Sequence, residues 1–230
     1  QPKRKQPKRK QPKRKPRKRL RERPRKSHKK KTNSLMIINE TIITTLNEDG
    51  SVHIAPMGVR REDDYFVIAP FKPSTTLQNL ERSGQAVINM TDDVRIFAGC
   101  LTGHYGWPTI NTSVINGKRL EAALSHIEIE VAHQNGDEIR PVFYCSEKHQ
   151  ETHAPFMGLN RAKAAVLEAA VLVSRLHMLP DEKIDNEIEY LQIAIDKTAS
   201  EQELEAWGWL MNRIKTFREQ NSTQEQGSTV

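Results

Sequence analysis

Hydrophobic and polar residues alternate along much of the chain between residues 37 and 145, a pattern typical of half-buried β-strands. β-Branched residues dominate from Ile37 to Leu46, Asn47-Glu48-Asp49-Gly50 supplies turn residues, and Val52 and Ile54 then alternate with polar neighbours. This pattern predicts a β-hairpin. Further strands are predicted over residues 65–69, 86–90, 127–131 and 139–145, the last two joined by the hairpin signal Asn135-Gly136. Six short strands favour a barrel.

Two kinds of helix are predicted. A short one lies between the third and fourth strands, where Ser74 suits an N-cap, Leu77 and Leu80 are apolar, and Gly84 suits the position after the last turn. After about Ser146 the hydrophobic period changes from two to about 3.6. Three amphipathic helices are predicted there, with apolar stripes over residues 162–176, 184–195 and 204–217. Pro180 marks the start of the second helix, and residues 200–203 (Ser-Glu-Gln-Glu) form a capping box at the start of the third.

The first 34 residues have a different composition. Residues 1–15 repeat the pentapeptide QPKRK three times, and residues 1–34 carry +18 of charge, so the remaining 196 residues carry −11 of the net +7. Like-charge repulsion and five prolines predict a disordered tail. Such a tail can bind RNA, DNA or an anionic surface without sequence preference. Alternatively it is an extension with no selected role, because Met36 begins a sequence with the pattern of a complete domain.

The predicted organisation is therefore a disordered tail (1–34), a barrel domain (35–150), a helical extension (151–220) and a flexible C-terminus (221–230). No stretch has the roughly 18 uncharged apolar residues of a membrane helix, so no membrane insertion is expected. No apolar segment follows the basic residues as it would in a secretory signal, and the two cysteines, Cys100 and Cys145, form no disulfide framework. We expect a cytoplasmic protein.

The start of the predicted short helix is a candidate anion site. Residues 71–76 (Phe-Lys-Pro-Ser-Thr-Thr) gather three hydroxyls and an ammonium where a helix presents its first backbone N–H groups and the positive end of its dipole. This combination suits a phosphate monoester. The spacing alone favours a simpler explanation, an N-cap serine followed by two threonines in the first turn.

A second candidate segment is Ala55-Pro56-Met57-Gly58-Val59, which we expect at the end of a strand. Proline removes a donor from the ladder and glycine has no side chain, so backbone groups there can face a flat ligand. An ordinary strand end is the alternative. Asn89, on the predicted strand over residues 86–90, is a polar residue that supports both candidate segments as parts of one binding site.

Three ordered blocks, residues 53–58, 72–80 and 86–93, together with Gly84, resemble the FMN-binding split-barrel superfamily, and more narrowly its domain-of-unknown-function 447 group. Residues 92–97 and 158–170 also match, so the resemblance covers Met36 to about Phe217. It implies an α+β, mainly β fold: a six-stranded split β-barrel with a C-terminal three-helix extension. It also implies a homodimer with FMN near the dimer interface.

The resemblance also implies which residues bind FMN. Pro56, Met57, Gly58 and Val59 would line the flavin ring, and the phosphate would be held by Lys72, Ser74, Thr75 and Thr76, helped by Asn79 and Asn89.

Arg161 is a further candidate binding residue, and its position on the chain indicates this. Together with Glu168 and Arg175 it forms one edge of a predicted helix. Arg161 would lie beside the FMN phosphate or an acidic substrate, or the edge would form ion pairs.

No metal site and no catalytic acid or base is predicted. Cys145, His149 and His153 would share one face of a helix, but Cys145 lies in a strand pattern and no fourth ligand is evident. A small-molecule substrate is expected, reduced or oxidised by hydride transfer through the flavin N5; the resemblance implies a link to one-carbon metabolism and a pterin-like substrate. The alternatives are a non-catalytic FMN carrier or sensor, and a nucleic-acid-associated protein that acts through residues 1–34.

Overall fold

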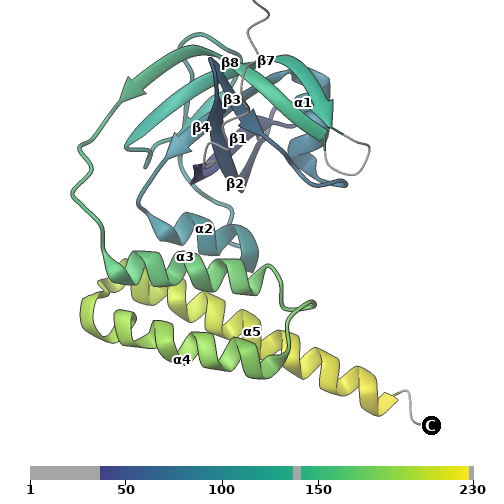
Figure 1. The fold of residues 1–230 in the computed structure, drawn as a ribbon, viewed down its shortest axis with the longest axis vertical. Coiled ribbons are helices and arrows are strands. Elements are labelled where there is room, and N and C mark those ends of the chain that lie inside the picture. The colour runs from purple at the N-terminus through teal and green to yellow at the C-terminus, as the bar shows by residue number, and fades with distance from the viewer. Residues whose placement is uncertain (1–36, 137–140, 228–230) are drawn as a thin grey trace, which may run out of the picture. The chain divides into compact units, whose positions relative to one another are not determined.

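The computed structural model describes residues 37–136 and 141–227, and the predicted tail over residues 1–34 lies outside them. Within the described residues, six antiparallel strands form a closed barrel: β1 (Ile38–Leu46), β2 (Val52–Glu62), β3 (Tyr65–Ile68), β4 (Gln85–Met90), β7 (Ser125–Gly136) and β8 (Pro141–Thr152) (Figure 1). Their order around the barrel is β1-β2-β3-β8-β7-β4, and β1 closes it by pairing with β4. The predicted six-stranded barrel is confirmed.

The barrel interior is filled by the apolar residues that alternate along the strands. Ile43, Ile88, Ile129 and Phe143 are almost completely buried there, and Leu77 from helix α1 (Thr75–Ser83) joins them. Both predicted caps of α1 are present, since the Ser74 hydroxyl accepts a hydrogen bond from the Leu77 N–H at 3.2 Å and Gly84 takes a left-handed conformation with φ of 67°.

Helix α2 (Val94–Thr102) connects the barrel to the C-terminal helices. Val94 and Ala98 belong to the core formed with those helices, whereas Ile96 and Phe97 pack on Ile42 at the barrel. Helix α2 was not predicted from the sequence, because its nine residues are mostly apolar and such a short apolar run does not distinguish a buried helix from a strand.

A small two-stranded sheet of β5 (Thr109–Asn111) and β6 (Lys118–Leu120) was also not predicted. Each strand has three residues, too few for a recognisable alternation. The sheet is attached to the barrel by polar contacts: the Thr44 hydroxyl donates to the Lys118 carbonyl at 2.6 Å, and the Leu120 N–H donates to Asn89 Oδ1 at 2.8 Å.

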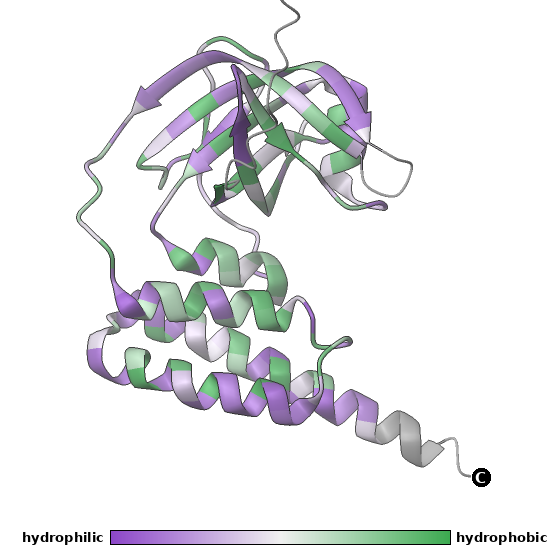
Figure 2. Ribbon diagram, in the orientation of Figure 1, coloured by the Kyte–Doolittle hydropathy of each residue, from purple (hydrophilic) through white to green (hydrophobic). Residues whose placement is uncertain are grey.

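The three predicted C-terminal helices are present as α3 (Arg161–Val173), α4 (Asp181–Thr198) and α5 (Glu201–Gly227). Figure 2 shows α2 and α3 as largely hydrophobic, in keeping with their position between the barrel and α4 and α5. The predicted capping box is present, since the Ser200 N–H donates to Glu203 Oε2 at 2.8 Å. Strand β8 continues to Thr152, past the expected change to helix at 150, and α5 continues to Gly227 instead of ending near residue 220. Among the described helices, none has the length and apolar character needed to cross a membrane.

Candidate functional site

The N-terminus of α1 presents an anion-binding surface. Lys72 and Thr75 are exposed and Ser74 is half-buried, while Thr76 is only 2 % exposed. The first turn, residues 75–78, contains no acidic side chain that would oppose an anion at the positive end of the helix dipole. Of the four predicted phosphate residues, Lys72, Ser74 and Thr75 are accessible to a ligand from solvent, and Thr76 is not.

The two predicted asparagines have polar contacts within the barrel. Asn79 Nδ2 donates to Thr45 Oγ1 at 2.9 Å and to Asn47 Oδ1 at 2.8 Å, which fixes α1 to the end of β1. Asn89 is fully buried; its Nδ2 donates to the Ile42 carbonyl at 3.1 Å and its Oδ1 accepts the Leu120 N–H. Both amides therefore hold strands and helices together in this chain.

The segment from Pro56 to Val59 lies in the middle of β2 and not, as expected, at the end of a strand. Residues 52–60 pair with β1 on one side, for example Ile42 with Pro56. On the other side, β3 pairs only with residues 60–62 among the strands that the structure describes. The second edge of β2 is therefore open beside Pro56, Met57, Gly58 and Val59, which explains how a proline is accommodated within a long strand.

Arg161 is exposed at the first turn of α3 and lines a groove of about 430 Å³. Glu40, Phe97 and Leu167 line this groove and also an adjoining groove of about 200 Å³ that reaches Pro56. The structure thus brings Pro56 and Arg161 to one connected surface between the barrel and α3. Residues 72–76, at the N-terminus of α1, line neither groove. The candidate site therefore has two separate parts, the α1 N-terminus and the grooves beside α3.

Arg161, Glu168 and Arg175 are all exposed, but the predicted helix edge is only partly right, because α3 ends at Val173 and Arg175 lies beyond it. Within the described part of the chain, none of the three forms an ion pair. An ion-pair ladder inside one chain is therefore not what holds Arg161 in place.

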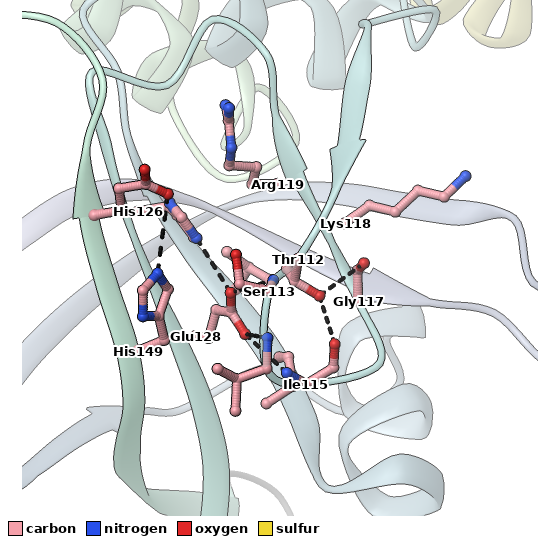
Figure 3. Close-up of polar contacts among 12 residues, drawn as sticks. Thr112, Ser113, Ile115, Gly117, Lys118, Arg119, His126, Glu128 and His149 are labelled. Atoms are coloured by element: carbon pink, nitrogen blue, oxygen red, sulfur yellow. Dashed lines mark hydrogen bonds and ion pairs between the residues drawn. The ribbon is translucent and has the colours of Figure 1, made fainter.

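A polar cluster lies on the outer face of β7 and β8 (Figure 3), and only two of its members, His149 and His153, were considered from the sequence, as ligands with Cys145 that were then set aside. The carboxylate of Glu128 is completely buried and accepts three backbone hydrogen bonds from the β5–β6 connection: from Ser113 at 2.7 Å, Val114 at 2.9 Å and Ile115 at 2.8 Å. Burial raises the pKa of Glu128, but the hydrogen bonds from these three N–H groups and from His126 together lower it by more, so the pKa lies below its ordinary value.

Histidines complete this cluster. His126, 1 % exposed, has its Nε2 3.4 Å from Glu128 Oε1 and its Nδ1 2.9 Å from His153 Nε2. His149 lies nearby, with its ring centroid 5.9 Å from that of His126. Burial lowers the pKa of His126 and so favours its neutral form.

Cys145 does not belong to this cluster, although it is on the same strand as His149. It is buried in the barrel interior, where burial raises the pKa of its thiol to about 12. A β-bulge in β8 separates the two residues, since Ile129 pairs with Glu147 and the adjacent Glu128 pairs with His149. The extra residue moves the side chains after it to the other face of the sheet, so the histidines point outward.

Comparison with known proteins gives two family matches. The family profile described as "Protein of unknown function (DUF447) N-terminal domain" matches residues 39–154, and the profile described as "Protein of unknown function (DUF447)", for the C-terminal domain, matches residues 160–212. None of the curated proteins compared with the chain matches it in sequence.

Several solved structures are similar to this chain to different degrees. An FMN-bound protein of the DUF447 family from Methanosarcina mazei is 19 % identical, with a TM-score of 0.67 over 76 % of this chain and 94 % of that one. A 2-nitrobenzoate 2-nitroreductase from Pseudomonas fluorescens is 22 % identical, with a TM-score of 0.43 over 50 % of this chain and 64 % of that one. The flavin reductase of styrene monooxygenase from Pseudomonas putida S12 is 14 % identical, with a TM-score of 0.42 over 51 % of this chain and 82 % of that one.

Proposed function

The chain belongs to the DUF447 family, and on that premise we propose that it is an FMN-binding flavoprotein that works as a homodimer and oxidises or reduces a small metabolite. The family's relative from Methanosarcina mazei, which shares the barrel and the helical extension, is described as FMN-bound. The observation in this chain that carries the proposal is the open edge of β2 at residues 56–59.

The open edge suits one side of a flavin ring. The ring has nitrogen and oxygen atoms along its edge that pair with backbone N–H and carbonyl groups, and a strand edge offers both in a fixed order. A Cβ added at Gly58 would lie 2.8 Å from Ile38 Cγ2 on β1. Glycine therefore fits at this position in β2 without displacing the Ile38 side chain.

The phosphate would bind at the N-terminus of α1. Lys72 supplies a positive charge, Thr75 a hydroxyl, and the helix its first N–H groups, so the donors present fit a phosphate dianion. Leu77 and Leu80 of α1 share a core cluster with Met57 and Val59 of β2, which fixes the helix against the strand that would hold the ring. FMN, when bound, supplies two-electron chemistry at N5, and the protein residues bind and orient it.

A second copy of the chain would complete the site. Large hydrophobic side chains are exposed at the start of β1 and in the β8–α3 connection: Ile37, Ile38, Phe156, Met157 and Leu159, the last 98 % exposed. Phe156 and Leu159 also line the groove that contains Arg161. An exposed apolar group beside an open groove is typical of a protein–protein interface, and it supports a homodimer whose partner closes this groove.

The test is to identify and reduce the bound flavin. Purified full-length protein is denatured and any released flavin is identified by chromatography; FMN is expected. The FMN-loaded protein is then mixed anaerobically with NADH or NADPH, and bleaching of the flavin absorption band is followed. Bleaching supports a reductase. Bound FMN that neither nucleotide reduces would contradict that role and favour a carrier or sensor.

A further inference from the structure

We propose that His126, Glu151 and His153 form a binding site for a divalent transition-metal ion of the zinc class, on the outer face of the barrel and separate from the flavin site. The ligands would be Nδ1 of His126, Nε2 of His153 and the carboxylate of Glu151. One candidate ligand atom from each of these side chains lies within 4.8 Å of the other two. Two imidazoles and a carboxylate are ligands that zinc commonly uses.

Strand register brings the three residues together. His126 on β7 pairs directly with Glu151 on β8, and His153 follows two residues later on the same face. The His153 N–H donates to the Leu124 carbonyl at 2.8 Å, so the β8 backbone remains attached to β7 as far as His153. The site is therefore built on paired backbone and not on a free loop.

Glu128 determines which nitrogen of His126 is free to bind. An ionised carboxylate only accepts hydrogen bonds, so the Nε2 of His126, 3.4 Å from Glu128 Oε1, carries the proton and donates it. The Nδ1 then keeps its lone pair and faces His153. A buried carboxylate that receives the second N–H of a histidine is the usual support behind a metal-binding imidazole.

The imidazoles of His126 and His153 face one another through ring nitrogens, Nδ1 of His126 and Nε2 of His153. The facing nitrogens are 2.9 Å apart, the ring centroids 5.0 Å, and the ring planes differ by 13°, so the rings lie edge to edge. Without metal, His153 Nε2–H donates to His126 Nδ1. With metal, His153 carries its proton on Nδ1 instead, and the ion takes the place of the shared proton.

Only a small movement is needed to admit the ion. A tetrahedral zinc site with bonds of about 2.0–2.1 Å has its nitrogens roughly 3.4 Å apart, so the facing nitrogens would separate by about half an ångström and each ring would tilt to point its lone pair at the ion. Glu151 is exposed and can move to complete the site, and the fourth coordination position is open to water.

The alternative ligand set of His126, Glu128 and His149 is less suitable, although these atoms are also close together. Three backbone N–H groups and His126 already occupy the hydrogen-bonding positions of the Glu128 carboxylate. A metal there would have to displace buried backbone hydrogen bonds. Two carboxylates, those of Glu128 and Glu151, lie close to His126, and the positive charge of Arg119 also acts on it.

The experiment is a zinc titration of the full chain after treatment with a chelator, followed by calorimetry, with Co²⁺ absorption as a second readout of nitrogen and oxygen ligands. Wild-type protein is expected to bind one Zn²⁺ in the barrel. Glu151→Gln and His153→Gln should each weaken this binding at least tenfold, and Glu128→Gln by about 10- to 100-fold because the imidazole loses its support.

The matched controls are Glu147→Gln, on the same strand before the bulge, and His177→Gln, an exposed histidine after α3; both should bind Zn²⁺ like the wild type. Circular dichroism checks that each variant is folded. Equal affinity in the ligand variants and the controls, or no Zn²⁺ bound by the wild type, would overturn the proposal and leave the cluster as a hydrogen-bonded support. The FMN content of the same samples is measured separately, so the outcome is independent of the flavin proposal.

Discussion

The Glu128 carboxylate accepts a hydrogen bond of 2.8 Å from the backbone N–H of Ile115, so a charged side chain on barrel strand β7 holds the β5–β6 connection. The carboxylate is fully buried, and the two neighbouring N–H groups of the connection point at it as well. Because a buried donor left without an acceptor is costly, this single acid should contribute strongly to the stability of the barrel surface.

Glu128→Gln tests this contribution. The amide keeps the size of the side chain but replaces an accepting oxygen by a donor, so we expect the free energy of unfolding in urea to fall by about 2–3 kcal/mol. Glu130→Gln is the control, because Glu130 lies on the same strand but forms an exposed ion pair with Lys148 and should contribute little. Equal effects of the two substitutions would contradict the role assigned to Glu128.

Arg161→Ala tests the part of the site beside α3. The guanidinium is exposed and lines the groove that continues toward Pro56, so its loss should weaken FMN binding while the thermal unfolding midpoint stays unchanged. Arg175→Ala removes an exposed arginine just after the end of α3, outside this groove, and should leave FMN binding unchanged. A large loss of thermal stability in Arg161→Ala would favour a structural ion pair between subunits instead.

The exposed apolar residues of the β8–α3 connection predict a dimer interface. A single charged side chain introduced there should disrupt the dimer. Leu159→Asp should convert the protein to a monomer in sedimentation equilibrium, because the aspartate would have to be buried in the interface. Met178→Asp, at an equally apolar exposed position after α3, should remain dimeric. A wild-type protein that sediments as a monomer would contradict the proposed assembly.

The capping box of α5 predicts a pH effect. Burial raises the pKa of Glu203, but hydrogen bonds from the Ser200 hydroxyl and N–H lower it by more, so the folded-state pKa lies below the ordinary value. Its stabilisation is therefore fully present above about pH 4.3 and is lost as the pH falls through the folded-state pKa. Glu203→Gln should cost about 1 kcal/mol at pH 7 and reduce the loss of stability between roughly pH 5 and pH 3.

Urea unfolding at several pH values measures this effect. Glu201→Gln is the control, because Glu201 is exposed in the same first turn. If the two variants show the same dependence on pH, the cap does not contribute as described.

Local patterns predicted most of the barrel, because alternating apolar residues, turn residues and helix caps act over a few positions. The Ser74 cap, the Gly84 end of α1 and the Ser200–Glu203 box are all where the sequence places them. The strand order was not derivable from these patterns. It depends on pairing between strands far apart in the sequence, and the family resemblance implied only that six strands form a split barrel.

Features that depend on distant contacts were missed. Helix α2 is apolar toward both the barrel and the helices, so its pattern resembles a buried segment of either type. The segment around Pro56 resembled a strand end because nothing local indicates that β3 stops short beside it. The bulge before His149 moves the histidines to the opposite face from Cys145, and no residue type announces such an insertion.

The central claim is that the chain binds FMN and holds its phosphate at the N-terminus of α1. The most direct test compares the affinities of the full chain for FMN and for riboflavin, which lacks the phosphate, by quenching of flavin fluorescence. We expect one FMN per chain and at least tenfold weaker binding of riboflavin. Lys72→Ala and Thr75→Ala should each lower the affinity for FMN by about 1–3 kcal/mol and leave that for riboflavin unchanged, whereas Lys197→Ala should change neither. No uptake of FMN, or equal affinities for the two flavins, would contradict the account.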